Sequence, residues 1–394
     1  MRTHPGLQNG PIYFDYNATT PVDPEVADAM LPYLESHFGN PSSTHRYGHI
    51  AHEAVHKARQ QVAELLGCTP GEIIFTGGGS ESDNLAIRGV ALARQAEGKH
   101  IITQVTEHPA VLNTCHALER WHGFRVTYLP VDSYGHVHPK DVEAAIEQET
   151  VLITLMHANN ETGTLQPIAE VAEIAHRHGV LVHTDAAQSV GKIPMQVKDL
   201  GVDLLTLAGH KLYAPKGIGA LYVRQGIQLE PLIYGGGQES GRRAGTENIA
   251  YIVGLGMACM VTQEYLAGDS VQRVQYLRDL LEQRLTELLP GTLHLNGHRT
   301  ERLPNTLNIS VDRIIGEEVL AAIPQIASST GSACHEGSTE PSAVLMAMGL
   351  SYTRALSALR LTLGRWSTED EVRRAAGLLA QTIASQREKE YNRQ

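Results

Sequence analysis

Between residues 72 and 225, short runs of apolar residues alternate with longer amphipathic stretches. The apolar runs predict strands at 72–77, 100–106, 124–131, 150–159, 179–187, 203–209 and 219–225. Their continuous Val, Ile and Leu content is typical of strands that are buried on both faces. Helical patterns such as 82–98 and 167–179 separate them. Such alternation predicts an α/β fold with a mostly parallel sheet.

The pattern changes after about residue 262, where a long helical stretch at 271–289 leads into a helix-rich C-terminal part with short strands. We therefore predict a large α/β domain over 15–262. A smaller α+β domain would be formed by 1–14 and 263–394.

Charge and cysteine content exclude several classes of protein. The formal net charge is −11, so no broad basic surface for nucleic acid is predicted. The four cysteines are far apart and form no C-x-x-C pair, so neither a disulfide framework nor a zinc site is indicated, and no metal is expected. The N-terminus lacks an apolar signal core, and no run reaches the ~18 apolar residues of a membrane span. We expect a cytoplasmic protein with no membrane partner.

Lys211 follows an apolar run and stands between Gly209 and Pro215. A lysine at the mouth of a pocket loses hydration, which lowers its pKa and makes its amine nucleophilic. Such an amine is what a Schiff base with pyridoxal 5'-phosphate (PLP) requires. Taken alone, the position is more typical of a solvated loop lysine.

Asp185 ends the run VLVHTD (180–185), at the carboxyl end of a predicted strand, where side chains point into the binding crevice of an α/β sheet. A carboxylate there can pair with the protonated pyridinium nitrogen of PLP. The alternative is that Asp185 caps the next helix.

A glycine-rich turn, FTGGGSESDN (75–84), joins a predicted strand to a helix. Around Gly79 and Ser80, backbone N–H groups and the helix N-terminus can hold a phosphate. The turn lacks the lysine of a nucleotide P-loop. His108 also follows a strand, and it either stacks on a planar ring and moves protons or simply begins a helix. Together with an Asn160 loop, these features occur at successive strand ends, which favours a PLP site.

With these features, the chain resembles cysteine desulfurases that supply sulfur for iron–sulfur cluster assembly. These belong to fold type I of the PLP enzymes and to the class V aminotransferases. The resemblance extends from FDYNATTP (14–21) to LRLTLGR (359–365). It rests on GNPSSTHRYG (39–48), TGGGSESDN (76–84), TEHPAV (106–111), HANNETG (157–163), HTDAAQSVGK (183–192), GHKLYAPKG (209–217), GGGQESGRRAGTEN (235–248) and STGSACHEGSTEPS (329–342).

The resemblance implies a PLP-dependent transferase that releases sulfur from L-cysteine as a persulfide and leaves L-alanine. It assigns Lys211 to the Schiff base and to proton transfer, Asp185 to the pyridinium nitrogen and Gln188 to the phenolic oxygen. His108 would stack on the ring and act as an acid or base.

The resemblance also assigns the phosphate and the substrate. Ser80 and His210 would hold the phosphate, with Thr246 reaching across from a second subunit, which implies a homodimer. Asn160 and Arg360 would bind the substrate carboxylate, since a guanidinium grips a carboxylate with two hydrogen bonds. The alternative for Arg360 is a surface ion pair.

Cys334 lies in a stretch rich in Gly, Ser and Thr (327–343), which is typical of a mobile loop. Cys259, in contrast, lies in an apolar segment. We therefore predict that Cys334 is the exposed thiol that takes up sulfur and delivers it to an acceptor protein of unknown identity. His335 would assist formation of its thiolate. The alternative is a passive loop cysteine.

Three features depart from the iron–sulfur assembly pattern. Ala208 stands where a phosphate-binding serine is usual, so PLP affinity would be lower by the worth of a charge-assisted hydrogen bond, roughly 1.5–3 kcal/mol. The pair Cys334–His335 resembles selenocysteine lyases. The polar tail lacks an apolar segment for a scaffold protein, so transfer RNA thiolation, DNA phosphorothioation or cofactor synthesis remain possible uses of the sulfur.

Three other functions remain open. A selenocysteine lyase would use the same PLP frame. A PLP aminotransferase would share Lys211 and Asp185 but would not need Cys334. A non-catalytic sulfur-relay protein would have lost PLP, against which the retained Lys211, Asp185, His108 and Ser80 argue.

Overall fold

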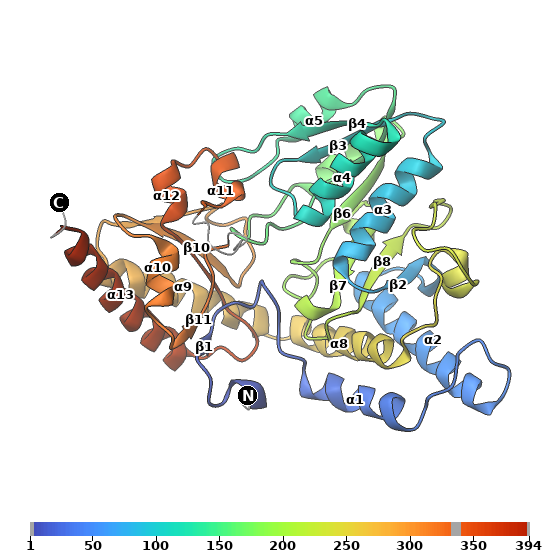
Figure 1. Ribbon diagram of the computed structural model, residues 1–394, viewed down its shortest axis with the longest axis horizontal. Helices are drawn as coiled ribbons and strands as arrows, with labels where there is room; N and C mark the ends of the chain where they lie inside the picture. The colour runs from blue at the N-terminus through green and yellow to red at the C-terminus, as the bar shows by residue number, and fades with distance from the viewer. Residues whose placement is uncertain (1–3, 332–339, 392–394) are drawn as a thin grey trace.

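The computed structural model describes residues 4–331 and 340–391. Its largest element is a seven-stranded sheet in which the strands lie in the order β2-β8-β7-β6-β5-β3-β4 (Figure 1). In that order the strands are Ile73–Thr76, Gly219–Val223, Leu204–Ala208, Leu181–Asp185, Thr150–Thr154, His100–Gln104 and Arg125–Leu129. The expected α/β class and mostly parallel sheet are confirmed.

One interior strand breaks the parallel order. β8 pairs antiparallel with both β7 and β2, whereas the pairs from β7 to β4 are parallel. Because two reversals cancel, β2 runs in the same direction as β7. The carboxyl ends of β2, β3, β5, β6 and β7 therefore meet at one edge of the sheet, which is where an α/β sheet forms its binding crevice.

Helices cover both faces of this sheet, as continuous apolar strands require. One face packs against α3 (Gly79–Ala93) and α4 (Pro109–His122). The other packs mainly against α2, α8 and α6 in the larger apolar core (Figure 1). The remaining helices of this part are α1 (Pro24–Glu35), α2 (Arg46–Leu66), α5 (Pro139–Ala145), α6 (Ile168–Arg177), α7 (Val197–Leu200) and α8 (Ile249–Ala267).

A second core lies in the C-terminal part and includes Ile12 and Phe14 from the N-terminal segment. Its antiparallel sheet has the order β12-β10-β9, and β1 pairs parallel with β11. The strands are β1 (Ile12–Tyr13), β9 (Leu293–Leu295), β10 (Thr306–Val311), β11 (Ile326–Ala327) and β12 (Ala358–Thr362). The helices are α9 (Ser270–Leu288), α10 (Gly316–Ala321), α11 (Ala343–Ala347), α12 (Tyr352–Leu356) and α13 (Glu369–Tyr391). The domain boundary predicted at residue 262 falls within α8.

Helix α8 is, among the described helices, long and apolar enough to cross a membrane by length and composition alone. The sequence predicts no such segment. Within the protein 44% of the helix window is buried, and α8 packs along α1 and α2. This burial is typical of a core helix.

Candidate active site

A cavity of about 660 Å³ lies at the shared carboxyl edge of the large sheet. The predicted site residues that line it are Gly79, Ser80, His108, Asn160, Asp185, Gln188, His210, Lys211 and Arg360. Asn17 from the N-terminal segment and Arg360 from β12 contribute walls from outside the large sheet. Residues distant in the sequence therefore converge on one chamber.

The glycine-rich turn forms the end of the cavity where α3 begins. Gly78 has φ +148°, a conformation that favours glycine. Gly219 also has to be small, because a Cβ there would come within 2.8 Å of the Gly78 backbone. The turn leads directly into the N-terminus of α3 at Gly79, which suits an anion.

Asp185 is the last residue of β6 and is 8% exposed. Its Oδ1 accepts a hydrogen bond from the Ala187 N–H at 2.9 Å. Asp185 therefore also caps the backbone that follows the strand, as the alternative interpretation expects in part. Burial raises the pKa of this carboxyl above its ordinary range. A cation opposite Asp185 would keep it ionised, which a protonated pyridinium nitrogen can provide.

His108 is the N-cap of α4, where its Nδ1 accepts the Ala110 N–H at 3.1 Å. This contact places the proton of the neutral ring on Nε2. Burial lowers the pKa of His108 below its usual value. Burial likewise lowers the pKa of His210 to about 4, so both rings are neutral near pH 7.

The amine of Lys211 lies just beyond β7 in a short 3₁₀ turn, Gly209–Lys211. It donates to the main-chain carbonyl oxygen of Asn17 and, at 2.8 Å, to that of Ala18. Burial, followed by the nearby positive charge of Arg360, lowers the pKa of Lys211 to about 8. The solvated alternative is wrong, because this amine is enclosed and predisposed to lose its proton.

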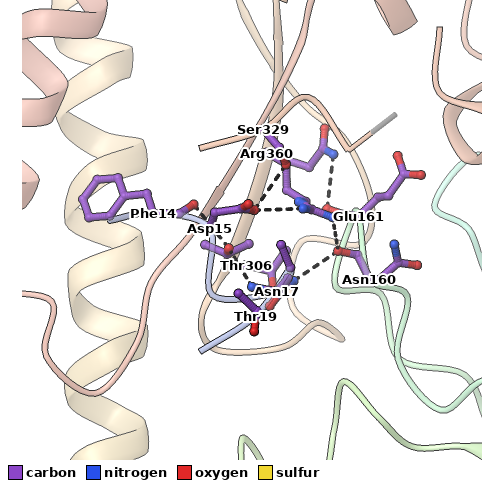
Figure 2. Close-up of polar contacts among 12 residues, drawn as sticks. Phe14, Asp15, Asn17, Thr19, Asn160, Glu161, Thr306, Ser329 and Arg360 are labelled. Atoms are coloured by element: carbon purple, nitrogen blue, oxygen red, sulfur yellow. Dashed lines mark hydrogen bonds and ion pairs between the residues drawn. The ribbon is translucent and has the colours of Figure 1, made fainter. Parts of the chain in front are cut away.

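Figure 2 shows Arg360 between Asp15 and the Asn160 loop. Arg360 is 6% exposed, and its Nη1 donates to the main-chain oxygen of Asn160 at 3.3 Å. Its Nε has no hydrogen-bond partner among the described residues. The surface ion pair is therefore wrong, since the guanidinium is buried beside the cavity.

Two buried acids near Asp185 were not predicted from the sequence. Asp83 lines the cavity, and burial followed by the charge of Asp185 raises its pKa well above the ordinary value. Burial raises the pKa of Glu107 to about 8. Glu107 is therefore mostly protonated at neutral pH, and burial favours the protonated form of Asp83 as well. Their mixed polar and apolar surroundings on α3 and after β3 gave no periodic signal.

Of the predicted site residues that the structure describes, one lies outside the cavity. Thr246 is exposed and does not line it. Cys334 and His335 lie outside the described residues.

A separate group of possible metal ligands lies away from this cavity. Nitrogen and carboxylate atoms of His136, His298 and Glu301 lie within 4.8 Å of one another. However, His298 Nδ1 already accepts the Glu301 N–H at 2.8 Å. Ligation through Nδ1 would use the lone pair that accepts this bond. Ligation through Nε2 would put the proton of the neutral ring on Nδ1, which could then no longer accept. We therefore assign no ion there.

The model of the aminotransferase class V family matches residues 12–375. The chain belongs to this family. It is 48% identical to cysteine desulfurase IscS of Methanosarcina thermophila over 95% of this chain and 93% of that protein. It is 47% identical to a mouse cysteine desulfurase, over 92% of this chain and 79% of that protein.

Solved structures agree with these relatives. A NifS-like protein superposes with a TM-score of 0.89 at 37% identity, over 95% of this chain and 99% of that one. A structure described as SspA in complex with cysteine has a TM-score of 0.80 at 42% identity, over 91% of this chain and 100% of that one. The comparisons confirm the resemblance to cysteine desulfurases, the fold-type I architecture and the dependence on PLP.

The residues of the cavity fit that cofactor. The turn at Gly78 and Gly79 offers N–H groups to a phosphate, and Asp185 offers a buried carboxylate to a ring nitrogen. Lys211 offers an amine of low pKa. Ala208 Cβ faces the turn, so no hydroxyl is available at that point.

Proposed function

We propose that this chain transfers sulfur from L-cysteine to Cys334, giving L-alanine and a protein persulfide. The observation that carries the proposal is the convergence of Lys211, Asp185 and Arg360 on one cavity. Bound PLP would supply an electron sink for the bond changes at the substrate Cα. The residues of the chain would bind, orient and move protons.

Arg360 and Asn160 would bind the substrate carboxylate. Arg360 donates through Nη1 to the Asn160 carbonyl and through Nη2 to Asp15, whereas its Nε has no partner among the described residues. An unpaired buried donor favours an incoming carboxylate, because the new bond restores what burial removed.

Lys211 would carry the proton at the substrate Cα. Its pKa of about 8 lets the amine accept and return a proton near neutral pH. His108, which is neutral with its proton on Nε2, would present a donor on the cavity side. Asp185 would remain ionised opposite the ring nitrogen.

Cys334 would accept the sulfur. Its thiolate attacks the substrate sulfur, the substrate Cβ–S bond breaks, and the substrate leaves as alanine after protonation at Cβ. The net change converts a protein thiol and L-cysteine into a protein persulfide and L-alanine, with no external oxidant or reductant. An acceptor thiol would then remove the persulfide sulfur.

The test compares the holoenzyme with Cys334→Ala in a single-turnover assay of alanine and protein-bound sulfur. We expect alanine from the wild type only, with equal cofactor content in both proteins. Full alanine formation by Cys334→Ala would favour an aminotransferase-like reaction instead. Faster turnover on selenocysteine than on cysteine, each at saturation, would favour a selenocysteine lyase.

We also propose a homodimer, because Thr246 is exposed and a second subunit would bring it to the phosphate turn. A mixed dimer of Lys211→Ala and Thr246→Ala subunits would contain one site with both residues intact. PLP affinity at that site should match the wild type. Equal weakness in mixed and Thr246→Ala dimers would contradict an exchange of Thr246 between subunits.

We further propose that the sulfur passes to an acceptor protein and that the enzyme is cytoplasmic. Unpaired thiols at Cys68, Cys115 and Cys259 support a reducing, cytoplasmic setting. Transfer of labelled persulfide sulfur to candidate acceptors in cell extract, followed by identification of the labelled protein, would test both.

A further inference from the structure

Lys192 is not one of the described residues that line the cavity, but it contacts Gln188 and Asn17, which are. It follows Gly191, which has a φ of +80°. Its Nζ donates to Gln188 Oε1 at 2.6 Å and to Asn17 Oδ1 at 2.7 Å. Burial, followed by the charges of Lys211 and Arg360, lowers its pKa well below the ordinary value. A polar group kept in such a position requires a physical reason.

We propose that Lys192 is a positioning residue that fixes the amide of Gln188 with its NH₂ group toward the cofactor. The inference rests on the proposed function, in which Gln188 lies beside the ring oxygen of PLP. It adds a residue that acts on the cofactor only through another side chain.

The hydrogen bonds at the two ends of Gln188 determine its orientation. The side chain is 6% exposed. Lys192 donates to its oxygen, and its Nε2 donates to the main-chain oxygen of Asn17 at 3.0 Å. Because an amide nitrogen carries two hydrogens, the second remains for an acceptor in the cavity. A ring oxygen that bears negative charge is such an acceptor.

Asn17 cannot replace Lys192 in this role. Its own amide is fixed, since Nδ2 donates to Thr306 Oγ1 at 2.9 Å and to the Asn160 carbonyl at 3.2 Å. The main-chain oxygen of Asn17 also accepts the Lys211 amine, and this bond is given up when that amine engages the cofactor. Among the described residues, Lys192 is therefore the side chain that donates to Gln188 Oε1, whereas Asn17 accepts from the other end of the same amide.

Removal of the Lys192 amine would leave Gln188 Oε1 buried without a donor. An unsatisfied buried acceptor costs about 1–3 kcal/mol, so the present orientation of the amide would lose its advantage over others. The NH₂ group would then no longer be held as a donor to the ring oxygen of PLP.

Lys192→Met tests this inference through the bound cofactor instead of through turnover. A donor to the ring oxygen stabilises its anionic form, so loss of the donor should raise the pH midpoint of the visible absorbance change of the holoenzyme. We expect a rise of about one pH unit and PLP binding weaker by roughly tenfold, which are typical of one charge-assisted hydrogen bond. Lys192→Arg, which has only donors, should retain most of the wild-type midpoint.

The decisive comparison uses a double variant. When Lys192→Met is added to the Gln188→Leu variant, the midpoint should not move further, because Lys192 acts only through Gln188. An equal shift in both backgrounds would overturn the inference. Lys198→Met, an exposed lysine on α7, is the matched control and should leave the midpoint unchanged.

Two further results keep the test interpretable. Should Lys192→Met fail to fold, Lys192→Gln offers either a donor or an acceptor, and we expect a smaller shift in the same direction. Absence of any visible band in the wild type would contradict the proposed function. A normal wild-type titration with no shift in the Lys192 variants would contradict the positioning role alone.

Discussion

Arg360 has a carboxylate partner within the protein itself: its Nη2 donates to Asp15 Oδ1 at 2.9 Å (Figure 2). The two residues are 345 positions apart and join β12 to the N-terminal segment. Ser329 Oγ also donates to Asp15 Oδ1 at 3.3 Å. The pair holds the guanidinium in one orientation, so a substrate carboxylate meets a preorganised group.

Arg360→Lys keeps a positive charge but loses the planar fork. We expect the KM for L-cysteine to rise by about 10- to 100-fold, which corresponds to one lost charge-assisted hydrogen bond of roughly 1.5–3 kcal/mol. The value of kcat should change less, and PLP content should stay the same. Steady-state kinetics with cofactor quantification would measure this. A fall in kcat with unchanged KM would contradict a role in carboxylate binding.

Ala208→Ser should strengthen PLP binding. A Cβ on Gly79 would lie 3.1 Å from Ala208 Cβ, so residue 208 directly faces the phosphate turn. A serine hydroxyl there would add a donor to a charged acceptor, and we expect PLP affinity to rise about tenfold. Titration of apo-protein with PLP measures the dissociation constant, with Ala208→Gly as the size control. Unchanged affinity in the serine variant would show that the phosphate lies elsewhere.

Much of the site was predictable because apolar runs define strand ends, and strand ends define the crevice. Gly79, His108, Asp185 and Lys211 each follow such a run and line one cavity. The interior antiparallel strand β8 was not predictable, because an apolar run carries no information about strand direction.

Contacts between distant segments could not be predicted from the sequence either. Asn17 lies within the motif FDYNATTP (14–21). Its partner Thr306 comes from the C-terminal part, whereas Gln188 and Lys192 follow β6 of the large sheet. The ion pair of Asp15 with Arg360 is of the same kind. Periodicity reports which face of an element is buried but not which distant polar group it meets.

The lowered pKa of Lys211 predicts how apo-protein captures PLP. The free amine is the reactive form, so the capture rate should rise with pH around a midpoint near 8 instead of 10.5. Arg360→Met should move this midpoint upward, because the positive charge of Arg360 lowers the pKa of Lys211. Rapid-mixing absorbance measures the rate, and N-acetyl-lysine at each pH corrects for ionisation of PLP. A midpoint near 10.5 would contradict an enclosed amine.

Glu161 predicts a pH dependence of stability. It is 6% exposed, and Ser342 Oγ donates to its Oε2 at 2.5 Å. Burial raises the pKa of this carboxyl from 4.5 to about 7. Because the folded pKa is raised, the stability that Glu161 contributes is fully present below about pH 4.5 and is lost as pH rises through about 7. The loss approaches roughly 3 kcal/mol.

Glu161→Gln removes this titration and keeps an oxygen that can accept from Ser342. The free energy of unfolding of the wild type, relative to this variant, should therefore fall between pH 4.5 and 8. Denaturant unfolding of both proteins at several pH values measures the difference, in which the other titrating groups cancel. Glu173→Gln, at an exposed position on α6, should follow the wild type at every pH. Parallel curves for wild type and Glu161→Gln would mean that the pKa of Glu161 is the same in the folded and the unfolded protein, which would contradict a raised pKa.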